Sequence, residues 1–96
     1  MIICKVVGHV WSTKKEEGLV GMKLMVVGEL DDAGCVTGNP FVAADVVGSG
    51  VGETVLVVEG SSARIAAGGN DVPVDCTIVG IIDTVEVERE KKGNRG

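Results

Sequence analysis

Five segments of the chain carry the apolar patterns of β-strands: Ile2–Trp11, Met22–Leu30, Phe41–Val47, Glu53–Glu59 and Cys76–Glu88. Segments rich in Gly, Asp or Asn separate them and predict turns at 18–21, 31–34, 38–40, 48–52 and 68–71. Short strands at this spacing are typical of a small β-barrel or sandwich. One short helix is expected after Gly60, capped by Ser61 or Ser62 and continued by Ala63–Ala67.

Two of these strands are apolar on both faces, whereas a half-exposed strand alternates apolar and polar residues. They contain Val55–Val58 and Ile78–Ile82. Helices usually cover the second face of such strands, but this chain leaves little length for helices. A neighbouring subunit is the other cover, and a domain of 96 residues buries only a modest fraction of its surface alone. The pattern therefore predicts a homo-oligomer in which Val55–Val58 lose exposed area on assembly.

Gly8 and Gly80 interrupt two of the apolar strands. Glycine in a strand marks a bend, as at the corner of a barrel, or a close approach of backbones. Both interpretations favour a closed barrel, which also removes the exposed edges that Val-rich strands would otherwise present.

Composition excludes several classes of protein. Hydrophobic residues make up 45% of the chain, with 19 Val, which excludes a disordered protein. No apolar run approaches the ~18 residues of a membrane helix, and the N-terminus lacks the pattern of a signal peptide. The net charge is −5 and aromatic residues are 2%, so a nucleic-acid partner is not expected. A binding module for an oligonucleotide or oligosaccharide is kept as the alternative function.

Charge divides the chain into two parts. Residues 89–96 carry four positive charges and one negative, which leaves −8 on residues 1–88. We expect 1–88 to form a single β-barrel domain and 89–96 to form a flexible basic tail, because the tail has no apolar residue to anchor it.

Little in the sequence indicates catalysis. Three widely spaced cysteines without a CxxC motif predict free thiols in a reducing cytosol, with Cys4 and Cys76 in the core and Cys35 in a turn. A lone His9 lacks the clustered ligands of a zinc site. No catalytic residue, cofactor or metal is therefore expected, although a thiol enzyme using Cys35 or Cys4 remains a third hypothesis.

The glycine-rich segment 48–52 resembles a phosphate-binding loop only superficially. Glu53 stands where the dinucleotide motif needs its third glycine, and the loop joins two strands. Three carboxylates, Asp45, Asp75 and Asp83, lie within apolar stretches, and a buried carboxylate needs a partner. Arg64 is the only arginine before the tail and is the leading candidate for that partner.

The order of several segments resembles the vertex-protein family of bacterial microcompartments, of the carboxysome and ethanolamine-utilisation type. The segments are Val6–Lys14, Leu19–Leu30, Val42–Glu53, Val55–Arg64 and Pro73–Asp83. This resemblance covers residues 1 to about 85. It implies an all-β fold, namely a small five-stranded barrel of the oligonucleotide/oligosaccharide-binding type with one short helix, assembled as a pentameric ring. The sequence itself leaves five and six subunits open.

The resemblance also implies a function and partners. Such rings are structural, non-enzymatic proteins that cap the vertices of a polyhedral shell in the bacterial cytoplasm, because flat hexagonal tiles cannot close without five-fold units. Their partners are copies of the same chain and the hexameric shell proteins of the same compartment.

The most characteristic segments are expected at the subunit contact or the ring axis, with intra-barrel turns and a capped helix as the alternative. The candidate residues are Asp45, Gly48, Ser49, Gly50, Gly52, Glu53, Val55, Val57, Gly60, Ser61, Ser62 and Arg64. Asp45 or Glu53 is predicted to pair with Arg64 of the same or the next subunit. The two aromatic residues, Trp11 and Phe41, are expected to be buried or at an interface.

Overall fold

The computed structural model describes residues 1–12 and 15–86. Its elements are the strands β1 (Ile2–Val10), β2 (Lys23–Leu30), β3 (Val36–Asp45), β4 (Thr54–Glu59) and β5 (Cys76–Ile81), a 3₁₀ turn η1 (Glu17–Leu19) and one helix, α1 (Gly60–Ala67). The basic tail predicted at 89–96 and the last two residues of the domain predicted at 1–88 lie outside the described residues.

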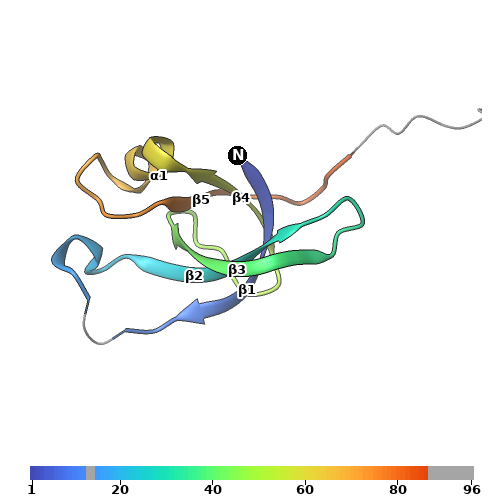
Figure 1. Ribbon diagram of the computed structural model, residues 1–96, viewed down its shortest axis with the longest axis horizontal. Helices are drawn as coiled ribbons and strands as arrows, with labels where there is room; N and C mark the ends of the chain where they lie inside the picture. Colours follow the sequence, from blue (N-terminus) through green and yellow to red (C-terminus); the bar gives the residue numbers. More distant parts are fainter. Residues whose placement is uncertain (13–14, 87–96) are drawn as a thin grey trace, which may run out of the picture.

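The five strands close into a barrel in the order β1-β2-β3-β5-β4 (Figure 1). All neighbouring pairs are antiparallel except β3 and β5, which pair in parallel over Ala44 and Asp45. As in any closed barrel, each strand has a partner along both edges; β1 pairs with β2 and with β4. The predicted five-stranded barrel of the oligonucleotide/oligosaccharide-binding type is confirmed.

Both glycines that interrupt the apolar strands lie at irregularities of the barrel. The β1–β2 register shifts between Val6 and Gly8, and the β4–β5 register shifts beside Gly80, whose partner is Leu56. A bulge inserts an unpaired residue and increases the local twist, which bends a strand around the barrel. The prediction of bends at Gly8 and Gly80 is therefore confirmed.

The turn predicted at 38–40 is wrong, because this segment belongs to a strand. β3 begins at Val36, opposite Leu30 of β2, and the hairpin turn is confined to residues 31–35. The register between β2 and β3 shifts between the pairs Val27↔Phe41 and Glu29↔Thr37. Proline is tolerated in strands at such bulges, so Gly38, Asn39 and Pro40 form an irregularity in a long hairpin.

The last strand is shorter than predicted, and the helix begins earlier. β5 ends at Ile81, so the alternating residues up to 86 add no strand in the described part of the chain. The helix begins at Gly60 after Glu59, whose side chain makes no capping hydrogen bond, so the predicted capping by Ser61 or Ser62 is wrong. Gly60 adopts φ 66°, which favours glycine, and its N–H donates to the backbone oxygen of Asp75.

The barrel interior is filled by small aliphatic side chains. Its core cluster consists of Cys4, Val6, Met25, Val27, Ala43, Val55, Val57 and Ile78. Helix α1 packs against β4 and β5 (Figure 1), and the Thr77 hydroxyl donates to the Ala63 carbonyl oxygen at 2.7 Å. The helix thus covers part of the outer surface, where the chain was expected to rely on neighbouring subunits.

Many large apolar side chains nevertheless remain in contact with water. In the described part of the chain, those exposed are Met1, Val7, Trp11, Val20, Val36, Val42, Val46, Val47, Val51, Ile65, Ile81 and Val85. Scattered exposed apolar residues are ordinary, but three of these, Val46, Val47 and Val51, lie in the one loop between β3 and β4.

Candidate functional site

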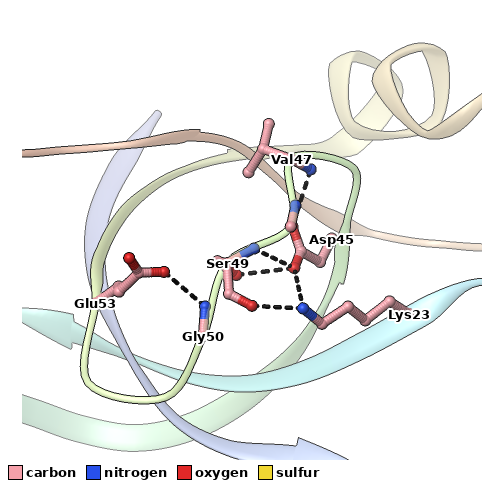
Figure 2. A network of polar contacts seen from close by, with 7 residues as sticks. Lys23, Asp45, Val47, Ser49, Gly50 and Glu53 are labelled. Atoms are coloured by element: carbon pink, nitrogen blue, oxygen red, sulfur yellow. Dashed lines mark hydrogen bonds and ion pairs between the residues drawn. The ribbon is translucent and has the colours of Figure 1, made fainter.

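The loop between β3 and β4 is organised around the carboxylate of Asp45 (Figure 2). Asp45 Oδ1 accepts hydrogen bonds from the backbone N–H groups of Val47 and Gly48, each at 3.0 Å. Asp45 Oδ2 accepts from the backbone N–H of Ser49 at 2.7 Å and from its hydroxyl at 2.9 Å. One carboxylate therefore fixes three consecutive residues of the loop.

Lys23 completes the network from the neighbouring strand. Its Nζ lies 3.1 Å from Asp45 Oδ2 and also donates to the backbone oxygen of Ser49. Lys23 of β2 and Asp45 of β3 are direct partners in the sheet register, and cross-strand partners of opposite charge attract each other. The Asp45 side chain is fully buried, whereas the Lys23 side chain is 35% exposed.

The network keeps Asp45 ionised. Burial alone would raise the pKa of this carboxyl group, but the hydrogen bonds from Val47, Ser49 and Lys23 outweigh burial and hold the pKa below its ordinary value. Because the carboxylate already occupies the N–H groups of 47–49, the loop offers them to no phosphate. The loop resembles a phosphate-binding loop because its N–H groups surround an anion, but this anion is the carboxylate of Asp45 in the same chain.

The second half of the loop is tied to the barrel. Glu53 Oε1 accepts from the Gly50 N–H at 2.7 Å, as Figure 2 shows. Gly52 N–H donates to the Val6 carbonyl oxygen at 2.8 Å, and Val6 N–H donates to the Glu53 carbonyl oxygen at 2.9 Å. With both ends held, the loop presents a defined surface.

This fixed loop carries three exposed apolar side chains. Val46, Val47 and Val51 are 47%, 39% and 63% exposed. A loop that is rigid before binding loses little conformational entropy when another surface covers it. The β3–β4 loop therefore has the properties of a preformed contact site.

Within one chain the predicted pairing of Asp45 with Arg64 is wrong, because Lys23 forms the ion pair with this carboxylate. Sequence spacing favoured the only arginine before the tail, but the register of β2 and β3 places a lysine opposite the carboxylate. Asp75 and Asp83 are exposed, so the prediction that they need a buried partner is also wrong. The predicted contact of Glu53 with Arg64 of a neighbouring subunit stays a prediction.

The other predicted site residues fall into two groups. Val55 and Val57 are fully buried in the core of one chain, so they have no area left to lose on assembly, and this part of the prediction is corrected. On the same strand, Leu56 is half-buried. The second group lies in the β3–β4 loop and in α1 and differs in exposure. Its exposed members are Gly48, Gly52, Glu53, Gly60, Ser61 and Ser62. Gly50 and Arg64 are half-buried, and Ser49 is buried.

The two aromatic residues differ in their surroundings. Phe41 is half-buried and packs against the core cluster, which confirms the prediction for this ring. Trp11 is 83% exposed in the single chain and stacks on the His9 imidazole with ring centroids 4.0 Å apart. Its predicted place at an interface stays a prediction.

The cysteines have the distribution of free, structural thiols. Cys4 is buried, Cys76 is half-buried and Cys35 is exposed. Burial, aided by the charge of Glu29, raises the pKa of the Cys4 thiol to about 11, and burial likewise raises the pKa of Cys76 above its ordinary value. Since the thiolate is the nucleophile, these shifts disfavour a thiol enzyme using Cys4.

Thiol labelling is therefore expected to separate the three cysteines. At neutral pH, a maleimide reagent should modify Cys35 rapidly in the folded protein, whereas Cys4 and Cys76 should react only on unfolding. The loss of the rapid phase in Cys35→Ser provides the control. A rapid phase that persists in Cys35→Ser would contradict this distribution.

No group of three or more His, Cys, Asp or Glu side chains within 1–12 and 15–86 is arranged to hold a metal ion. In the same ranges, no helix has the length and apolar character needed to span a lipid bilayer.

The fold and the loop define the class of protein as a small closed barrel of the oligonucleotide/oligosaccharide-binding type whose β3–β4 loop exposes apolar side chains. Residues 1–83 match the family described as ethanolamine utilisation protein EutN/carboxysome. The chain therefore belongs to the EutN/CcmL family.

Individual relatives agree with this assignment. The carboxysome shell vertex protein CcmL of Synechococcus elongatus is 50% identical over 88 residues, which cover 92% of this chain and 89% of that protein. The solved structure of a GrpN pentameric microcompartment shell protein from Rhodospirillum rubrum is 44% identical, with a TM-score of 0.82, and covers 92% of this chain and all of that one. A solved carboxysome subunit, CcmL, is 49% identical with a TM-score of 0.84 and 91% of each chain covered. The family is one of structural shell proteins, and the chain is not an enzyme.

Proposed function

We propose that this chain is a structural shell protein that forms pentamers and caps the vertices of a polyhedral bacterial microcompartment in the cytoplasm. The observation that carries the proposal is the group of exposed apolar side chains on an acidic barrel, above all on the rigid β3–β4 loop. A relative of 44% identity and nearly equal length is titled a pentameric shell protein.

A ring accounts for the arrangement of apolar surface in one subunit. In a closed ring, each subunit makes head-to-tail contacts in which one surface meets a different surface of its neighbour. The loop that carries Val51 is one such surface, and the half-buried Leu56 with the exposed serines of α1 lies on the next two elements along the chain. We propose that these residues, Glu53 and Arg64 among them, lie at or near the subunit contact.

The hexameric shell proteins of the same compartment are the proposed second partner. A layer of six-fold tiles is flat, and replacing a tile by a five-fold unit introduces the curvature that a closed shell needs. The alternative function, a binding module for an oligonucleotide or oligosaccharide, lacks support from chemistry: the chain is acidic, and its aromatic residues are Phe41, packed on the core, and Trp11, stacked on His9.

Shell closure tests the proposed function directly. Hexameric shell protein from the same compartment, produced together with this chain, should form closed polyhedra with five-fold density at the corners in electron micrographs. Without the chain, the same hexamer should form open sheets or tubes. Closed shells that form equally well without the chain, and that contain none of it when it is supplied, would contradict the proposal.

A further inference from the structure

An open pocket of about 570 Å³ lies between the β2–β3 hairpin and the segment that follows β5. Apolar residues form one part of its lining and carboxylates form another: Ile3, Leu30, Ala33 and Val85, with Asp31 and Asp32. Within 1–12 and 15–86, no lysine or arginine lines the pocket. The chemistry of the pocket therefore suits a ligand that combines aliphatic groups with positive charge.

The acidic side of the pocket is preformed. Asp31 Oδ1 accepts hydrogen bonds from the N–H groups of Ala33 and Cys35, each at 2.9 Å, and the Asp31 N–H donates to the Cys35 carbonyl oxygen at 2.9 Å. These bonds hold the hairpin turn in one conformation, with Asp31 and Asp32 both exposed to solvent. A cationic ligand would thus meet two adjacent carboxylates without reorganising the turn.

The chain itself runs from the barrel into the wall of this pocket. Ile82 N–H donates to the Thr54 carbonyl oxygen at 2.8 Å, which ties the segment after β5 to the start of β4. Thr54 and Val85 both line the pocket. In Figure 1 the chain leaves the barrel on the side on which the β2–β3 hairpin projects. Val85 therefore lies in the same pocket wall as the carboxylates of the turn.

The sequence beyond this point has the complementary charge. Residues 89–96 contain Arg89, Lys91, Lys92 and Arg95 against the single acid Glu90. Lysine and arginine bury long aliphatic stems on apolar surface while their charged ends reach a polar partner. The family match ends at residue 83, so this basic segment is a feature of the chain outside the matched barrel.

We propose that the basic segment 89–96 docks in the pocket of its own chain, with its cationic side chains on Asp31 and Asp32 and their stems on the apolar wall. Lys91 is six residues beyond Val85, a distance of up to ~20 Å in extended chain, which suffices for the segment to reach the turn. Docking would neutralise the acidic turn and cover the exposed Val85. Both partners belong to one chain, so the proposal does not depend on ring formation.

Disulfide formation with the exposed Cys35 tests the docking. In the full chain carrying Lys92→Cys, the thiol oxidant diamide should close a disulfide between Cys35 and the introduced thiol within one chain, visible as a fast-migrating monomer on a non-reducing gel. Since exposed charges are screened by salt, 0.5 M NaCl should slow closure at least threefold. Asp32→Asn, or Lys91→Glu in the tail, should slow closure to a similar extent.

Asp71→Asn provides the matched control, because it removes the same charge from an exposed loop outside the pocket lining and should leave the rate unchanged. Lys91→Glu lies outside the barrel, so it tests the docking even if Asp32→Asn disturbs the hairpin. A rate that is insensitive to salt and to both substitutions would overturn the proposal. Disulfide-linked dimers in place of the closed monomer would overturn docking within one chain. The native mass of the same samples reports on the ring separately.

Discussion

Asp45→Asn is expected to lower the free energy of unfolding by about 3 kcal/mol at neutral pH, because one partner of a buried ion pair is neutralised. Asparagine offers one acceptor oxygen in place of two and turns an N–H₂ group toward the donors Ser49 and Lys23. Lys23, whose side chain is 35% exposed, can interact with water instead. The Ser49 N–H and hydroxyl lose the Oδ2 acceptor, whereas the retained oxygen can still accept from the N–H groups of Val47 and Gly48. Chemical denaturation at a fixed chain concentration measures the loss.

The effect has a defined pH dependence. The folded protein lowers the pKa of Asp45, so its stabilisation is complete above the unfolded pKa of about 3.9 and is lost as the pH falls through the lower folded pKa. The difference between wild type and Asp45→Asn should therefore shrink as the pH falls below about 4. Asp71→Asn, in an exposed loop, is the control and should change stability by less than about 0.5 kcal/mol. Equal stability of the two variants at neutral pH would refute the role given to Asp45.

Val51→Glu is expected to convert the ring into monomers at micromolar concentration. Val51 is 63% exposed in one chain, so the substitution should leave the fold of the single barrel unchanged. In the ring, each contact would have to bury a carboxylate among apolar groups, at a cost of about 3 kcal/mol or more without a partner. Such a cost weakens each contact by roughly 100-fold. Light scattering coupled to size-exclusion chromatography measures the change in mass.

The matched control for this prediction is Val20→Glu. Val20 is 68% exposed and follows the η1 turn, outside the β3–β4 loop in sequence, so the same added charge is expected to leave the ring intact. If Val51→Glu retains the mass of the wild-type assembly, the β3–β4 loop does not form the subunit contact.

The barrel was predictable because its strands carry strong local signals. Val-rich runs such as Val55–Val58 and the glycine-rich turns define five strands and one helix by composition alone. The sequence-based predictions were wrong where the outcome depends on contacts between residues that are far apart in the sequence. The bulge around Pro40 depends on the pairing of β2 with β3. The residue types of Gly38-Asn39-Pro40 taken alone predict a turn, because they carry no information on this pairing.

The site was predictable only in outline, for the same reason. The loop and Asp45 stand out in the sequence, but the partner of Asp45 depends on register: Lys23 precedes it by 22 positions and lies directly opposite it in the sheet. One feature of the sequence could have identified this partner: Lys23 is at the start of an apolar strand, and Asp45 is at the end of the strand that pairs with it in the hairpin. The run Val55–Val58 was expected to lose exposed area to a neighbouring subunit. Val55, Val57 and Val58 are already buried within one chain, and α1 packs against their strand.

The most direct test of the central claim is the native mass of the full chain across micromolar concentrations. The single barrel exposes the apolar side chains of its rigid β3–β4 loop, and we expect the chain to occur as an assembly of five copies of its 9.8 kDa subunit. A soluble, folded species of one subunit's mass throughout that range would contradict the account.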